Sequence, residues 1–112
     1  MARSGLGEFE ELVLLAVAAL GDQAYGLGVR DMLHTEAGRS VSLGAVHAAL
    51  YRLEDKGLLG SELGGATEQR GGRRKRLFRV TGSGARALES ARVARERLRT
   101  LAQPALQLQF GA

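Results

Sequence analysis

The apolar residues between positions 6 and 20 have helical spacing. One stripe of this segment carries Phe9, Leu12, Val13, Ala16 and Leu20. The other side is apolar too, with Leu14, Leu15, Val17 and Ala18. Acidic residues crowd the first turn, where the helix dipole favours negative charge. Because a helix that is apolar nearly all round is buried on several sides, and the core of so small a domain is modest, the segment predicts a subunit interface in addition to the core.

A second, shorter helix is predicted over residues 25–35, after a break at Gly21 and Asp22. Its candidate core residues are Leu27, Met32 and Leu33. The segment ends near Gly38.

A third helix is predicted over residues 43–56, with Ser42 as its N-cap and Gly57 just past its end. The inward stripe consists of Leu43, Val46, Leu50 and Leu53. The opposite face has small or polar side chains, Ala45, His47, Ala48 and Arg52. A helix with such an outer face can approach another surface closely.

Two strands are predicted over residues 58–63 and 77–81, joined by a glycine-rich and strongly basic loop over residues 64–76. Thr81 then caps a final helix over residues 82–103, which we expect to end before Pro104. Its apolar stripe is interrupted by Arg95, so a regular coiled coil does not follow. For the remaining residues, a helical extension and a disordered end both stay open.

The order helix, helix, helix, hairpin, helix predicts a mainly α fold with a β-hairpin wing, a winged helix-turn-helix. We divide it into a DNA-binding domain (1–81), a C-terminal dimerisation helix (82–104) and a tail (105–112). The narrow outer face of the third helix suits the major groove, which is about 12 Å wide. The basic hairpin beside it suits the flanking phosphates or the minor groove, and its glycines at 71 and 72 either make the turn or let the backbone approach a phosphate closely.

The candidates for other chemistry are weak. His47 either reads a base edge or is a solvent-exposed helix histidine, and His34 is an ordinary residue near the end of the second helix. Adjacent acids such as Glu10 and Glu11 point about 100° apart on a helix, so they cannot share one acid–base site. With no nucleotide-binding loop or serine elbow in the sequence, we expect neither an enzyme nor a cofactor or metal.

Composition supports a nucleic-acid partner. The formal net charge is +4, and lysine occurs only at positions 56 and 75, so the basic residues are nearly all arginine. Arginine suits phosphate and guanine, although GC-rich codon usage also enriches it.

An anionic membrane surface is the second candidate partner, but the longest apolar run is too short for a bilayer, which takes about 20 residues. The chain has no cysteine, so disulfides and thiolate sites are excluded, and we expect a soluble cytoplasmic protein.

Several segments in order carry a family resemblance: LGEFEELVLLAV (6–17), AYG (24–26), SLGAV (42–46), LYRLEDKGLL (50–59), RGGRRKR (70–76) and RVTGSG (79–84). Together they resemble the PadR family of bacterial transcriptional regulators, from about residue 6 to residue 90. The C-terminal part is short, as in the smaller subgroup of that family.

The resemblance implies a homodimer whose third helix enters the major groove, whose wing touches the DNA backbone or minor groove, and whose last helix packs on the partner's first helix. The implied recognition helix contributes Ser42, Gly44, Ala45, His47, Ala48 and Arg52. The implied backbone and wing contacts are Tyr25, Arg70, Gly71, Gly72, Arg73, Arg74, Lys75 and Arg76. The expected dimer interface is Leu6, Phe9, Leu14, Val17, Leu88, Ala91, Leu98 and Leu101.

Two residues depart from the family pattern. His47 stands where the family usually has tyrosine, and Ala48 where it commonly has proline or threonine. Many family members respond to phenolic acids or drugs, but aromatic residues are scarce here and tryptophan is absent, so the sequence gives an effector no support.

The expected function is therefore a dimeric repressor on a two-fold symmetric operator, with half-sites about one helical turn apart. The alternative is a winged helix that serves as a protein–protein interaction module, in which the first and last helices carry the function.

Overall fold

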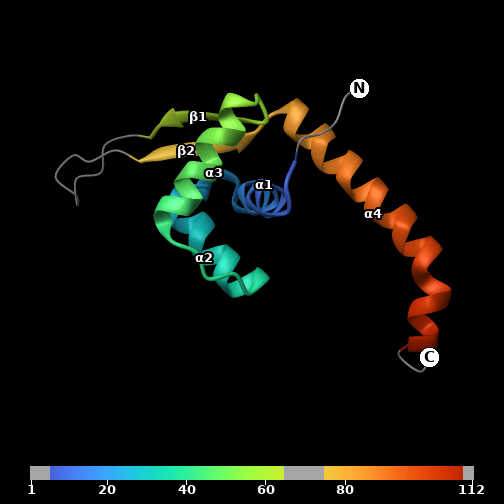
Figure 1. The fold of residues 1–112 in the computed structure, drawn as a ribbon. Helices are drawn as coiled ribbons and strands as arrows, with labels where there is room; N and C mark the ends of the chain where they lie inside the picture. Colours follow the sequence, from blue (N-terminus) through green and yellow to red (C-terminus); the bar gives the residue numbers. More distant parts are fainter. Residues whose placement is uncertain (1–5, 65–74, 110–112) are drawn as a thin grey trace.

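The computed structural model describes residues 6–64 and 75–109. The elements are α1 (Glu8–Leu20), the 3-10 turn η1 (Gly21–Gln23), α2 (Gly26–Ala37), α3 (Leu43–Asp55), β1 (Leu59–Leu63), β2 (Arg76–Val80) and α4 (Gly82–Gln109). The strands pair antiparallel, with Leu59 opposite Val80 and Leu63 opposite Arg76. Figure 1 shows α1, α2 and α3 gathered beside this hairpin, while α4 extends away from them. The predicted mainly helical fold with a hairpin wing is confirmed.

The core lies between α1, α2, α3 and the hairpin. Its largest fully buried side chains are Phe78, Leu14, Leu50, Leu53, Val13, Val17, Val29 and Val46. This corrects one part of the predicted dimer interface, because Leu14 is 0% and Val17 1% exposed within a single chain. Both side chains are buried in the chain's own core, because α2, α3 and β2 all pack against α1. The large apolar side chain that α1 exposes is Leu15 instead, which is 48% exposed.

Helix α3 begins and ends as its sequence predicts. The Ser42 hydroxyl accepts a hydrogen bond from the Ala45 amide at 3.0 Å, which satisfies one of the free donors of the first turn. Gly57, just past the end, has a φ of +79°, a conformation that side chains other than glycine rarely adopt. The predicted inward stripe is confirmed at Val46, Leu50 and Leu53, which are fully buried, whereas Leu43 is half-buried.

The predicted core face of α2 is partly wrong. The helix begins at Gly26 and buries Val29 and Leu33 at helical spacing. Leu27 therefore lies on the outer side, 47% exposed. Two glycines near the start of the helix leave it little apolar patterning of its own, so packing against α1 and α3 decides its rotation.

The start of α4 is held against the hairpin by hydrogen bonds and close packing. The Thr81 hydroxyl accepts from the Gly84 amide at 3.1 Å, which confirms the predicted cap, and donates to the Gly57 carbonyl at 2.7 Å. A Cβ atom on residue 84 would come within 2.9 Å of Val80 Cγ1 and nearer to the Leu58 carbonyl oxygen. The first turn of the helix thus sits tightly on the strands.

The predicted end of this helix before Pro104 is wrong, because α4 continues through Pro104 to Gln109. Of the two open interpretations of the tail, the helical extension is the one observed as far as residue 109. Proline removes one helical hydrogen bond and leaves the carbonyl four residues earlier without its donor. Because every side chain from residue 92 to 105 is exposed, water can reach that carbonyl.

Candidate nucleic-acid interface

The outer face of α3 is formed by small exposed residues. Gly44, Ala45 and Ala48 are all exposed, and Ser42 is exposed at the cap before them. Tyr51, one turn further along, is exposed as well, and its ring packs edge-on against buried Phe78 at a centroid distance of 5.8 Å. The sequence interpretation missed Tyr51, although its spacing of three residues from Ala48 could have placed it on this face.

His47 lies at the contact between α3 and α2 and is half-buried. Its imidazole packs against Gly26, the first residue of α2, and its ring centroid is 6.2 Å from that of Tyr51. His47 is thus not a fully exposed helix histidine, and its contact with a base edge stays a prediction. The exposed small residues and Tyr51 therefore belong to the accessible surface of α3, together with Arg52, whose side chain is 54% exposed.

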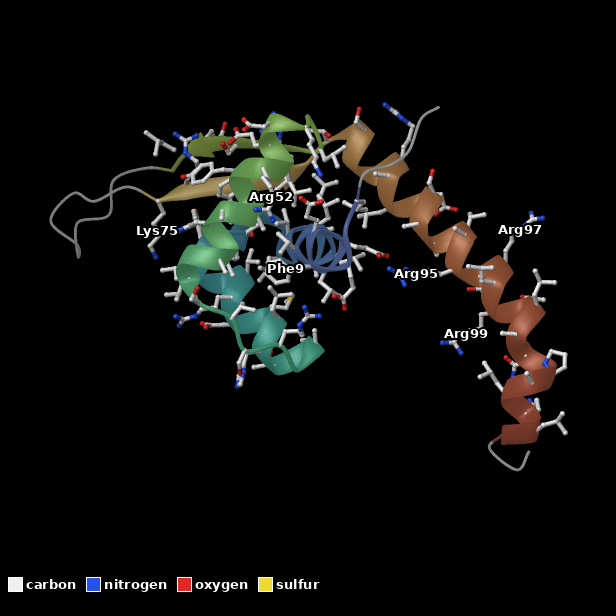
Figure 2. The ribbon with its side chains drawn as sticks, in the orientation of Figure 1. Phe9, Arg52, Lys75, Arg95, Arg97 and Arg99 are labelled. Carbon is white, nitrogen blue, oxygen red and sulfur yellow. The ribbon has the colours of Figure 1, made fainter. Side chains whose placement is uncertain are left out.

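Arg52 was predicted to project from α3 toward DNA, but its guanidinium is paired within the chain. Its Nε lies 3.0 Å from Glu10 Oε2 on α1, while Lys56 Nζ lies 2.9 Å from Glu10 Oε1. Figure 2 shows Arg52 directed from α3 toward α1. The sequence pattern could not show this partner, because Glu10 is 42 residues away in the chain.

Glu10 is a buried acid with well-placed donors. Burial alone would raise the pKa of its carboxyl, but hydrogen bonds from Lys56, Arg52 and the Gly7 amide outweigh burial and hold the pKa below the ordinary value of 4.5. Glu10 is therefore ionised at neutral pH.

The base of the hairpin brings a cation and a tyrosine together. Lys75 Nζ lies 5.6 Å from the ring centroid of Tyr25, and a side chain on Gly64 would touch the same tyrosine. The Gly64 amide donates to the Lys75 carbonyl at 2.6 Å and continues the strand pairing. Tyr25 and Lys75, far apart in sequence, thus share one edge of the hairpin.

Arg76 is tied to α3 through Ser61. Its Nη1 donates to the Ser61 hydroxyl at 2.9 Å, and that hydroxyl donates to Glu54 Oε2 at 2.6 Å. This chain of hydrogen bonds sets the position of the hairpin relative to α3. The other predicted wing residues, Arg70, Gly71, Gly72, Arg73 and Arg74, lie outside the described residues.

The remaining residues of the predicted dimer interface divide into two groups. Leu6, Phe9, Leu88 and Ala91 are half-buried in the single chain, and Arg39 stacks over the Phe9 ring at 5.7 Å. Leu98 and Leu101 are 67% and 76% exposed on the projecting part of α4. A separate apolar groove of about 400 Å³ runs between α1 and α2, lined by residues that include Leu12, Leu15, Ala19 and Met32.

Two further properties concern residues 6–64 and 75–109, the described part of the chain. No group of three or more histidine, aspartate or glutamate side chains is placed to hold a metal ion there. None of the helices described is both long enough and apolar enough to cross a membrane.

A family model described as the transcriptional regulator PadR-like family matches residues 14–90. The chain belongs to this family. Membership confirms the resemblance seen in the sequence and places the chain among transcriptional regulators rather than enzymes. No curated protein matches the sequence significantly.

Solved structures of PadR proteins share the fold. A PadR-like transcription factor from Bacteroides fragilis superposes with a TM-score of 0.72 at 23% identity, over 87% of this chain and 88% of that one. A PadR-like regulator from Bacillus cereus has a TM-score of 0.68 at 21% identity, over 88% and 91%. Bacillus subtilis PadR, solved in complex with operator DNA, has a TM-score of 0.62 at 17% identity, over 76% of this chain and 46% of that one.

Proposed function

We propose that this PadR-family protein binds a two-fold symmetric operator as a homodimer and acts as a repressor. The observation that carries the proposal is the exposed face of α3, where Gly44, Ala45 and Ala48 leave the helix narrow. Such a helix fits the major groove, about 12 Å wide, without side chains holding it away from the base edges. Tyr51 adds an aromatic hydroxyl on the same side.

Contacts to the DNA backbone come from the edge beside this helix. Tyr25 and Lys75 lie together there, and Arg70, Arg73 and Arg74 precede Lys75 in the sequence. Cations placed on phosphates supply affinity that depends on salt and not on sequence. The complex of Bacillus subtilis PadR with operator DNA supports this proposal, because the two proteins share the fold.

Dimerisation is inferred from apolar surface that one chain leaves uncovered. The projecting part of α4 exposes Leu98, Leu101 and Leu108, and the groove between α1 and α2 is apolar. An exposed apolar stripe and an apolar groove on the same chain are complementary surfaces for a second copy. We infer that α4 of one chain packs against α1 of the other, and that the dimer acts on DNA in the cytoplasm.

The same exposed stripe on α4 favours the second candidate, a protein-interaction module that does not bind an operator. Selection of duplexes from a random library by the full chain, followed by gel shifts at several salt concentrations, distinguishes the two. A repressor enriches a symmetric sequence. Failure to enrich any duplex at low salt, by a chain that still forms a stable dimer or hetero-complex, would favour the interaction module.

A matched pair of variants tests the surface of α3. We expect Ala48→Glu to abolish binding to the selected duplex, because a negative charge and added bulk would face the phosphates. Ala85→Glu, at an exposed alanine on the first turn of α4, should leave binding nearly unchanged. Equal affinity for both variants would remove α3 from the interface.

A further inference from the structure

The first turn of α1 carries three carboxylates that each reach a different part of the chain. Glu8 Oε2 lies 2.8 Å from Arg39 Nη1 in the loop before α3. Glu10 holds Arg52 and Lys56 in the last turns of α3. Glu11 Oε1 lies 2.6 Å from Arg95 Nη2 on α4, and Arg95 Nε donates to the same oxygen at 3.2 Å. We call Glu8, Glu10 and Glu11 the acidic turn.

The acidic turn holds the recognition helix near both of its ends. Arg39 stands three residues before Ser42, the N-cap of α3, and Lys56 is the C-cap residue of the same helix. Glu10 is only 7% exposed, so its hydrogen bonds with Arg52 and Lys56 are partly shielded from water. The rotation and tilt of α3 are thereby tied to one turn of α1.

The same turn reaches α4 where that helix has few other attachments. Ala87 and Leu88 pack against the core, but every side chain from residue 92 to 105 is exposed. Figure 2 shows Arg95 reaching from α4 toward α1, with Arg99 on the same side and Arg97 pointing away. Glu11 is the better buried partner of the pair, with its side chain 14% exposed against 63% for Arg95.

We propose that the acidic turn sets the angle between the recognition helix and α4, and so determines which spacing of half-sites the dimer accepts. In this arrangement Glu11 and Arg95 are positioning residues, which act on DNA recognition without touching DNA. The inference rests on the proposed function, because α4 joins the two chains and α3 reads each half-site. A change in the angle between them moves the two recognition helices relative to each other.

The angle can be measured without DNA. Because the chain has no cysteine, Ala48→Cys on α3 and Gln103→Cys on α4 give two labelling sites, both exposed in the single chain. Double electron–electron resonance on spin-labelled full-length chains, diluted with unlabelled chains, then reports the distance within one chain. We expect a narrow distance distribution for the parent, a broader or shifted one for Glu11→Gln and for Arg95→Gln, and a return toward the parent for the exchange Glu11→Arg with Arg95→Glu.

The control breaks an ion pair that lies within a single helix. Glu89→Gln removes the pair between Glu89 and Arg92, which lies within α4 and is 2.8 Å long. We expect this variant to keep the parent distribution. A parent-like distribution for Glu11→Gln and Arg95→Gln would overturn the proposal, as would a Glu89→Gln variant that broadens the distribution equally. Urea unfolding of each variant establishes that it is folded.

A second measurement tests the consequence for DNA. The selected operator is resynthesised with one or two base pairs added or removed between its half-sites, and affinity is measured for each spacing. For Glu11→Gln, we expect the ratio between the best and next-best spacing to fall by about two- to five-fold, the range that loss of one ion pair allows. Affinity for an isolated half-site should stay at the parent value, which a general loss of structure would not permit.

The two measurements separate the two possible failures. A parent protein that enriches no duplex overturns the proposed function, whereas the label distances still decide whether the acidic turn holds α4. A parent that binds its operator, with a Glu11→Gln variant of unchanged spacing preference, overturns the inference alone.

Discussion

The imidazole of His47 lies directly against Gly26, at the point where α2 begins. A Cβ atom on residue 26 would come within 2.8 Å of His47 Cδ2 and still nearer to Nε2. The glycine therefore makes room for the histidine, and the pair sets how closely α2 and α3 approach each other at this edge.

Replacing Gly26 with alanine should displace His47 toward the exposed face of α3. We expect the free energy of unfolding to fall by about 1–3 kcal/mol, the usual range for overpacking. Urea unfolding measures the change. In a double-mutant cycle, His47→Ala should remove most of the cost of Gly26→Ala, and additive effects of the two changes would show that the histidine is not the obstacle.

Gly44→Ala is the matched control for that prediction. A Cβ atom there would have only Ser42 Oγ in ordinary contact, at 3.9 Å. Alanine in a helix is favoured over glycine by about 0.5–1 kcal/mol, so this variant should be as stable as the parent or more stable.

Glu10→Gln should destabilise the protein in a pH-dependent way. Glutamine cannot hold both cations as a carboxylate does, and we expect a loss of about 1 kcal/mol at pH 7, because Arg52 and Lys56 are more than one-third exposed and solvent screens them. Since the pKa of Glu10 is lowered by folding, its ionised form stabilises the protein above the ordinary value of 4.5, and this contribution is lost as the pH falls through the folded pKa.

Urea unfolding of the parent and Glu10→Gln between pH 7 and pH 3 checks this prediction. The two unfolding free energies should converge at the acidic end. Glu62→Gln, at an exposed acid on β1, serves as the control and should match the parent throughout. A difference for Glu10→Gln that is as large at pH 3 as at pH 7 would show that the ion pairs are not its cause.

Removing the wing cations should weaken DNA binding without changing sequence preference. We expect Arg70, Arg73 and Arg74 changed together to alanine to lower affinity for every duplex, because protein–phosphate hydrogen bonds carry no sequence information. The slope of log affinity against log salt should become shallower by about 0.9 for each phosphate that the variant no longer neutralises. Gel shifts over a salt series measure both effects.

A control that removes the same charge elsewhere distinguishes direct contact from net charge. Arg86, Arg92 and Arg97 are exposed on α4, and changing these three to alanine should reduce affinity less than the wing variant does. Equal reductions in the two triple variants would mean that the wing does not touch the DNA directly.

The exposed leucines of α4 should support the dimer. We expect Leu98→Gln combined with Leu101→Gln to weaken dimerisation by at least about tenfold, since burial of one leucine contributes about 1.5–3 kcal/mol. Analytical ultracentrifugation over a concentration series measures this. Leu63→Gln, at a leucine 52% exposed at the end of β1, should leave the dimer intact. A parent protein that is monomeric at high concentration would contradict the interface.

Much of the fold follows from local rules. The Ser42 and Thr81 caps, the glycine after α3 and the buried stripe of α3 were all predicted, because a cap or a helical stripe involves residues within a few positions of one another. The two strands followed from composition and turn residues in the same way. The order of these elements along the chain, together with the family resemblance, was enough to predict a winged helix.

Contacts between distant segments were decided only by the tertiary structure. An all-round apolar helix such as α1 gives no indication of which side its own chain covers, so Leu14 and Val17 were placed in the wrong interface. The pairing of Arg52 with Glu10 and the packing of His47 against Gly26 join residues far apart in sequence, so no pattern of nearby residues predicts them. Charge and shape complementarity depend on which elements become neighbours, whereas caps and periodicity depend on the adjacent chain alone. The sequence therefore determined the elements and their order, and the packing of α1 against α3 and α4 determined which of their side chains remain available for a partner.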